Sequence, residues 1–325
     1  MKKTLYTLLI IGLLSSQIIK AEPKEEDYLD YHLKIRQAEA LIAENSFKRA
    51  LNVYQEVFSS YSFVFLRDYK IAAQLAWQMG DGSKACEFVK SGIAGGWKMK
   101  DIKQTKFLKS LRSTTEFKTV KADYDSLRDV YLKRINSELR WEVRKMSWKD
   151  QWKALMALFR FSEKGQARYG ERKFAPKNEL RLQRVLEIIE DYGYPGERLI
   201  GNEPWMMGIV GRRNQISQEF CKKDTVYQQM KPILLTAIAK GEMQPVYYAF
   251  IDDWFITIES GWKTGSYGLL TELNQEDIVR SNRLRKKIGL RTVETHNRLI
   301  DIQEQTDMWF YLEPKGNSKI GLVDQ

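Results

Sequence analysis

The stretches AEALIAENSFKRALNVYQEVF (Ala38–Phe58) and AAQLAWQMGDGSKACEFVKSG (Ala72–Gly92) decide the fold of this chain. Each joins a run of small apolar residues to a polar turn and then to a second apolar run, which is the pattern of a helical hairpin. Small apolar positions of the first stretch recur in the second about 35 residues later. These positions are Ala38, Ala40 and Ala50, which align with Ala73, Leu75 and Ala85.

A period near 34 residues, with alanines where two helices approach closely, is typical of tetratricopeptide repeats, which this region resembles. One hairpin buries only one face, so neighbouring units must stack. We expect Phe107, Leu108, Leu111 and Phe117 to cover the end of the stack. The resemblance implies a concave groove that binds a peptide or a partner protein, with generic helical hairpins as the alternative.

The first 21 residues have the order of a secretory signal peptide. Lys2 and Lys3 precede an apolar run from Leu5 to Leu14, and the small residue Ala21 precedes the predicted cut. The apolar run is shorter than the about 18–20 residues that a membrane-spanning helix needs. We therefore expect export to the periplasm or the extracellular space, and a retained anchor is the alternative.

The formal net charge of +11 includes three lysines of the predicted signal peptide. The remaining positive charge favours anionic partners such as the surface of the bacterial envelope. Export argues against nucleic acid as a partner. The densest basic cluster is at a predicted helix end, where we expect solvated cations, and contact with anionic lipid or polysaccharide is the alternative. This cluster comprises Arg280, Arg283, Arg285, Lys286, Lys287 and Arg291.

Cys86 and Cys221 are the only cysteines of the chain. An oxidising compartment allows a disulfide between them, and two separate buried thiols are the alternative. Neither cysteine has another cysteine or a histidine at ligand spacing, and no phosphate-binding or dinucleotide-binding fingerprint occurs. The sequence therefore predicts no metal site and no cofactor.

The segment from Tyr124 to Phe161 contains neither proline nor glycine and predicts a long connecting helix. Trp141, Trp148 and Trp152 fall on one face of that helix. We expect these rings to pack one domain against the next, because large aromatic side chains dominate protein cores. The alternative is an exposed aromatic platform for a sugar or a partner.

Helix start and stop signals continue through the rest of the chain and predict a mostly helical second domain. Asn178, Pro204, Asp224, Pro245 and Asn274 are the expected starts. Glycines end most of these segments, and Pro232 predicts a kink inside one of them.

Several short motifs resemble an uncharacterised domain at the C-terminus of exported bacterial proteins. They are KGQAR (Lys164–Arg168), DYGYPGERLIG (Asp191–Gly201), LLTAIAKGEMQP (Leu234–Pro245), AFIDDW (Ala249–Trp254), GSYG (Gly265–Gly268) and RLRKKIGL (Arg283–Leu290). The resemblance implies a common fold and no reaction. The chain departs from the family pattern at Gly165, where an Asp is expected, and lacks the family's His between Arg212 and Phe220.

The family residues that this chain keeps are Gln166, Asp252, Tyr267 and Gly268. Gln166, Asp252 and Tyr267 are the candidate catalytic residues if the domain is an enzyme. Asp252 and its neighbour Asp253 point about 100° apart on a helix, so we expect at most one of them to face the core.

Asp252 suits a structural ion pair with an arginine such as Arg213 or Arg283. A general acid with a raised pKa is the alternative. His32 and His296 are the only histidines, and no nucleophile elbow is present. We expect these histidines to have surface or capping roles.

The sequence thus predicts an all-α fold, and a non-enzymatic, protein-binding or scaffolding protein of the bacterial envelope. The alternative function is an envelope hydrolase with a degenerate site around Asp252 and Tyr267. The expected divisions are a signal peptide (1–21), a polar leader (22–27), a tetratricopeptide-like region (28–125), a connecting helix (126–161), a helical C-terminal domain (162–313) and a tail (314–325).

Overall fold

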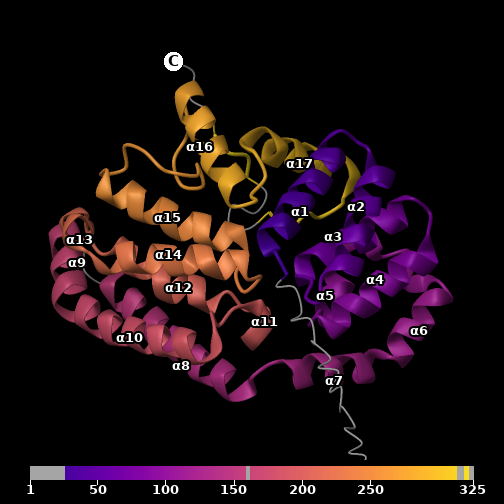
Figure 1. Ribbon diagram of the computed structural model, residues 1–325, viewed down its shortest axis with the longest axis horizontal. Helices are drawn as coiled ribbons and strands as arrows, with labels where there is room; N and C mark the ends of the chain where they lie inside the picture. The colour runs from indigo at the N-terminus through magenta and orange to yellow at the C-terminus, as the bar shows by residue number, and fades with distance from the viewer. Residues whose placement is uncertain (1–25, 159–161, 313–317, 322–325) are drawn as a thin grey trace, which may run out of the picture.

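A computed structural model describes residues 26–158, 162–312 and 318–321 (Figure 1). These residues form helices joined by turns and loops, and no β-strand occurs among them, which confirms the predicted all-α class. No helix in the described part of the chain is both long enough and apolar enough to cross a membrane. The predicted signal peptide lies outside the described residues, as do most of the leader and of the tail.

Two helical hairpins occupy the repeated stretches. They consist of α1 (Tyr28–Ala43) with α2 (Phe47–Ser60), and α3 (Leu66–Gln78) with α4 (Gly82–Ala94). The turns match as well, because Asn45 and Gly80 hold equivalent places and both have a left-handed backbone, with φ of 58° and 78°. Of the aligned positions, five are completely buried: Ala38, Ala50, Ala73, Leu75 and Ala85.

Short helices cover one end of these hairpins. They are α5 (Met99–Gln104) and α6 (Glu116–Ala122), with single 3₁₀ turns at Lys106–Leu108 and Leu111–Ser113. Leu108, Leu111 and Phe117 are fully buried in the core of the hairpins, and Phe107 packs against that core. These side chains therefore cover the stack as expected.

The predicted single connecting helix is wrong, because it divides into α7 (Tyr124–Arg134) and α8 (Ser137–Leu158). Asn136 causes the break. Its side chain accepts the N–H of Leu139 at 3.0 Å, which caps α8, and its own N–H donates to the carbonyl of Leu199 at 2.9 Å.

The tryptophans of α8 also differ from the expectation. Trp141, Trp148 and Trp152 are 50%, 59% and 66% exposed, so they do not pack one domain against the next. The opposite side of α8 makes the contact, with Leu139 and Val143 buried in a second core.

That second core lies among the helices that follow α8. They are α9 (Glu163–Tyr169), α10 (Ala175–Tyr192), α11 (Glu197–Ile200), α12 (Trp205–Gly211), α13 (Gln218–Lys223), α14 (Val226–Ala239), α15 (Pro245–Glu259) and α16 (Gln275–Lys287). The first of them, α9, contributes no described side chain to this core. The helix expected to start at Pro204 ends at Gly211, and a separate helix, α13, follows because Ser217 accepts the N–H of Phe220 and starts it anew. Pro232 lies inside α14.

Residues near the end of the chain pack into the core of the helical hairpins, which is the first core of the molecule. Helix α17 (Val293–Thr306) packs beside α1, and Figure 1 shows the two helices side by side. The side chains that complete the first core from this segment are Leu299, Ile300, Ile302, Met308, Phe310 and Leu312. The region 162–313, expected to form one C-terminal domain, therefore contributes its last helix and the following segment to the N-terminal core.

Candidate functional site

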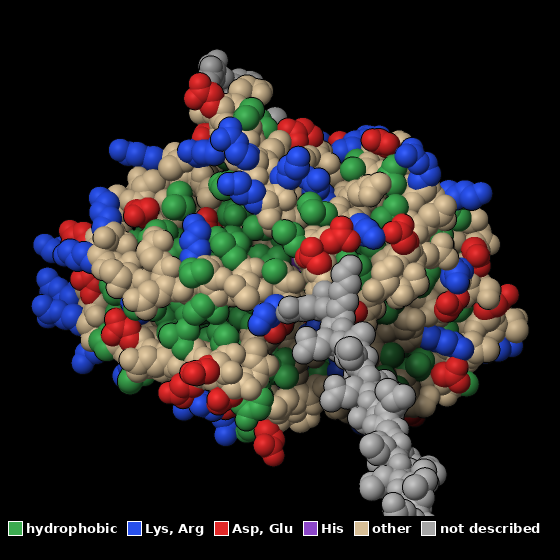
Figure 2. Space-filling view, in the orientation of Figure 1, with side chains coloured by type: hydrophobic (Ala, Val, Ile, Leu, Met, Phe, Trp, Pro, Cys, Tyr) green, Lys and Arg blue, Asp and Glu red, His purple; other side chains and the backbone are tan. Residues whose placement is uncertain are grey.

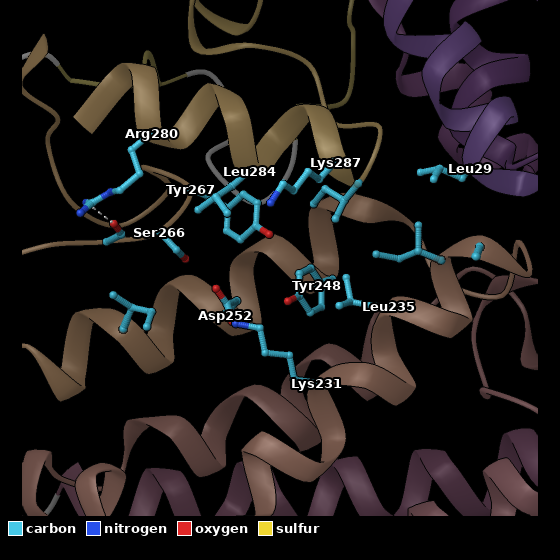
Figure 3. A pocket seen from close by; sticks show the side chains of 15 residues that line it. Leu29, Lys231, Leu235, Tyr248, Asp252, Ser266, Tyr267, Arg280, Leu284 and Lys287 are labelled. Atoms are coloured by element: carbon cyan, nitrogen blue, oxygen red, sulfur yellow. Dashed lines mark hydrogen bonds and ion pairs between the residues drawn. The ribbon is translucent and has the colours of Figure 1, made fainter. Parts of the chain in front are cut away.

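A pocket of about 590 Å³ lies between α14, α15 and α16, next to the start of α1 (Figure 3). It brings together two of the predicted site residues, Asp252 and Tyr267. Its walls are mainly apolar. The apolar aliphatic side chains of the lining are Leu29, Leu235, Ile238, Ala239, Ile256, Leu284 and Ile288.

Asp252 lies at the base of this pocket and is 3% exposed. Its carboxylate pairs with Lys231 at 2.8 Å and accepts the hydroxyl of Tyr227 at 2.8 Å. The predicted structural ion pair thus exists, but its expected partner is wrong. Arg213 binds Asp224 instead, at 2.7 Å. Asp252 is therefore a buried carboxylate whose negative charge is balanced by the ammonium group of Lys231 on α14.

Asp253 is also buried, with no exposed surface, so the expectation that at most one of the two aspartates faces the core is wrong. Its carboxylate accepts backbone N–H groups of the loop between α15 and α16, at 2.6 to 2.9 Å. The donors are Ser266, Tyr267, Leu269 and Leu270. Asp253 thus fixes the loop that carries Tyr267 over the pocket.

Arg285 holds the same loop from α16. Its guanidinium donates to the carbonyl of Tyr267 at 3.0 and 2.6 Å and to the carbonyl of Arg291 at 2.9 Å. Burial lowers the pKa of Arg285 to about 9, so it remains charged at neutral pH. The GSYG motif fits this frame, because a Cβ at Gly265 would lie 2.8 Å from the Asp253 carboxylate.

The tyrosine hydroxyls of the pocket stay protonated. Tyr248 and Tyr267 meet edge to face, with ring centroids 6.0 Å apart. Burial raises the pKa of each, and the nearby charge of Asp252 raises it further. The two hydroxyls are hydrogen-bonded to each other, with Tyr248 as the donor, so the proton of Tyr267 is the one left to donate to a ligand. Neither hydroxyl can act as a base near neutral pH.

Cations line the side of the pocket that faces α16. Arg280 is paired with Asp277 at 2.8 Å and donates to Thr264 at 2.7 Å. Lys287 lines the pocket without an ion pair to any described residue. Figure 2 shows apolar side chains gathered near the centre of this face, with Lys and Arg side chains above them.

The third predicted site residue, Gln166, does not line the pocket. It lies on α9 and is exposed. The histidines do not line it either, and both are buried, contrary to the expected surface or capping roles. Burial lowers the pKa of His32 to about 3, so it is neutral. The ring of His296 lies 3.2 Å from the carbonyl of Ser318.

Cys86 and Cys221 are free thiols buried in different cores, the first among the hairpins and the second on α13, which packs against α15. The disulfide that the sequence allowed is not formed. Burial raises the pKa of the two thiols to about 11 and about 12. Both groups are therefore poor nucleophiles.

The basic cluster near the end of α16 does not form one solvated surface. Arg285 and Arg291 are 1% and 4% exposed, and Arg291 pairs with Glu39 of α1 at 3.3 Å. Lys286 and Lys287 are exposed in the last turn.

The face formed by α1 and α3 is covered by the chain itself. Gln74 of α3 forms two hydrogen bonds with the backbone of Trp309, and Arg67 donates to the carbonyl of Tyr311 at 3.2 Å. A cavity of about 610 Å³ remains beside this segment, lined by side chains that include Lys70 and Trp97.

Sequence reasoning missed Tyr227, Lys231 and Tyr248 as neighbours of Asp252. Tyr227 and Lys231 are one turn apart on α14, so their shared face could be predicted, but nothing in the sequence aligned that face with α15. Among the residues that the structure describes, no three His, Cys, Asp or Glu side chains form a group that could hold a metal ion.

No family model, curated protein or solved structure matches this chain. The two resemblances therefore rest on the sequence motifs alone.

Proposed function

We propose that this chain is an exported, non-enzymatic binding protein whose pocket between α14, α15 and α16 holds an amphipathic anion such as a fatty acid. The observation that carries the proposal is a pocket of about 590 Å³ with apolar walls and cationic side chains along one side. This size is within the range of small-molecule sites, which combine apolar walls with a few polar groups that orient the ligand.

The apolar part of the ligand fits the end of the pocket near α1. Leu29 and Leu235 lie there, away from Arg280 and Ser266 (Figure 3). Burial of a hydrocarbon chain against such side chains is worth about 0.8 kcal/mol for each methylene group. The pocket therefore favours a ligand with a substantial apolar body.

The charged part of the ligand fits beside α16. Lys231 is neutralised by Asp252, and Arg280 is engaged by Asp277, whereas Lys287 has no such partner among the described residues. An anionic head group next to Lys287 would complete the charge balance, and the hydroxyl of Tyr267, which accepts from Tyr248, supplies a hydrogen-bond donor. A cationic head group would be repelled by Lys287, because the nearby carboxylates of Asp252 and Asp277 are already paired.

The proposal also includes a protein or peptide partner of the repeat hairpins, with a smaller binding site than a whole concave groove. The α1 and α3 face already holds residues 307–312, so the site for such a partner is the cavity of about 610 Å³ beside Lys70 and Trp97. Both binding roles fit a scaffold without chemistry of its own.

The alternative, an envelope hydrolase, is favoured by the common location of Asp252 and Tyr267 in one pocket. Against it, Asp252 is held by Lys231 and Tyr227, and the pocket lining includes neither a histidine nor a second carboxylate. A base and a nucleophile in hydrogen-bond reach are what such a reaction needs.

Calorimetric titration of the mature chain with laurate, lauryl alcohol and lauryl trimethylammonium tests the proposal, because these compounds share one chain and differ in head-group charge. We expect laurate to bind most tightly and the trimethylammonium compound least. Equal affinity for all three would contradict an anion site. Hydrolysis of a lauryl ester that is abolished by Asp252→Asn would favour the hydrolase.

A further inference from the structure

The outer face of α8 carries a row of exposed aromatic and apolar side chains. Trp141, Trp148 and Trp152 are 50%, 59% and 66% exposed, and Leu155 and Met156 continue the row at 44% and 40%. Exposed tryptophans that follow one helix face are uncommon on a surface that contacts only water, and such patches mark interaction sites.

The buried side of α8 makes contacts that fix the rotation of this helix about its own axis. Leu139 and Val143 are buried in the second core, and Asp150, with no exposed surface, pairs with Arg181 and Arg212 at 2.7 Å each. These contacts hold the opposite, tryptophan-bearing face outward. Figure 1 places α8 along the lower edge of the molecule.

Cations accompany the tryptophans on this face. Arg144 lies 5.7 and 5.0 Å from the ring centroids of Trp141 and Trp148, and Lys145 lies 5.0 Å from that of Trp141. Lys149 is exposed as well.

Acidic groups offset these cations only weakly. Glu142 is bound by Arg184 at 2.7 Å, and Asp150 is buried. Glu138, in the first turn of α8, is the exposed carboxylate of this helix among the described side chains. The exposed face is therefore both aromatic and positively charged.

We propose that this face of α8 docks on an anionic lipid bilayer, with the helix lying in the plane of the head groups. Tryptophan prefers the boundary between head groups and acyl chains, and Lys or Arg side chains add about 1 kcal/mol each next to an anionic surface. Exposed tryptophans together with Lys and Arg are the side chains that proteins place at the surface of an anionic bilayer.

The geometry favours lipid over a sugar or a flat protein surface. A sugar stacks on an open ring face, whereas Arg144 and Lys145 already lie over the rings of Trp141 and Trp148. Lipid phosphates can bind these cations from the side while the ring edges enter the boundary region.

Co-sedimentation of the mature full chain with vesicles tests the proposal. The vesicles contain phosphatidylcholine alone or equal parts of phosphatidylcholine and phosphatidylglycerol. We expect binding to the anionic vesicles only, and at least about tenfold weaker binding after Arg144→Gln, Lys145→Gln and Lys149→Gln are combined. The combined Trp148→Gln and Trp152→Gln variant should also lose most of the binding.

Matched controls lie elsewhere on the surface. Combined Lys48→Gln, Arg49→Gln and Lys118→Gln removes three exposed cations from other helices, and Trp262→Gln removes a tryptophan that is 58% exposed. Both controls should bind anionic vesicles like the parent chain. Binding that the α8 variants leave unchanged would overturn the proposal. The proposal would also be overturned if the parent chain bound neither type of vesicle, even if α8 captured a protein from envelope extract.

Discussion

The side-chain amide of Gln74 in α3 forms two hydrogen bonds with the backbone of Trp309, each 2.8 Å long. Its Nε2 donates to the carbonyl of Trp309, and its Oε1 accepts the N–H of the same residue. Gln74 itself is completely buried. The Gln74 side chain thus pairs with both backbone hydrogen-bonding groups of Trp309, in place of a neighbouring strand or turn. It thereby attaches this C-terminal segment to the helical hairpins.

Replacing Gln74 with alanine should therefore destabilise the protein by about 2 kcal/mol, because both backbone groups of Trp309 lose a partner in a partly buried place. Urea unfolding measures this change, and Gln78→Ala, at an exposed position of the same helix, is the matched control. Equal stability of the two variants would show that the contact contributes nothing.

Glu197 should make stability depend on pH. It joins the two cores by accepting the N–H of Leu66, at the start of α3, and the amide of Gln244. Burial raises its pKa from 4.5 to about 7. Between these values the folded chain binds a proton that the unfolded chain has released, so stability falls as pH rises through this range.

Glu197→Gln removes this pH dependence, because the glutamine side chain does not ionise. The difference in unfolding free energy between parent and variant should therefore change by on the order of 1 kcal/mol between about pH 4.5 and about pH 7 and stay constant above that range. Thermal or urea unfolding across this range gives the two curves. Parallel curves would mean that Glu197 has an ordinary pKa in the folded state.

The sequence predicted what local patterns determine. The hairpin turns, the cap of α16 at Asn274 and the apolar side chains that cover the hairpins all follow from spacing and capping rules. The break at Asn136 was also readable, since an Asn-Ser pair is a good helix start, but the absence of proline and glycine concealed it.

Contacts between distant segments could not be predicted in the same way. Nothing local indicates that Met308, Phe310 and Leu312 complete a core begun near Tyr28, or that Lys231 lies beside Asp252. The tryptophans of α8 show the same limit. Their common face was evident, but whether it faces the protein or the surroundings depends on the partners of the opposite face.

Asp253 should be essential for the loop over the pocket. In Asp253→Asn one carboxylate oxygen becomes an NH₂ group and faces backbone donors instead of accepting from them. We expect a loss of about 3 kcal/mol in unfolding free energy and weaker ligand binding, because Tyr267 is carried by this loop. Asp191→Asn, at an exposed acidic position, should change neither quantity. An Asp253 variant with parent stability would contradict the role of this carboxylate.

Cys86 and Cys221 should react with a thiol reagent only after unfolding. Their raised pKa values and their burial leave little accessible thiolate at about pH 8. Labelling with an aromatic disulfide reagent, with and without urea, measures this directly. Rapid labelling of the folded chain would contradict the buried positions, and two unreactive cysteines in urea without reductant would indicate a disulfide.

The affinity of Lys287→Gln for laurate, measured by calorimetry beside the parent chain, tests the central claim most directly. Lys287 lines the pocket, whereas its neighbour Lys286 does not, so Lys286→Gln controls for the loss of one positive charge in the same turn. We predict that Lys287→Gln weakens laurate binding about fivefold or more, while Lys286→Gln binds like the parent chain. Unchanged affinity in Lys287→Gln, or no laurate binding by the parent chain, would contradict the proposed anion site.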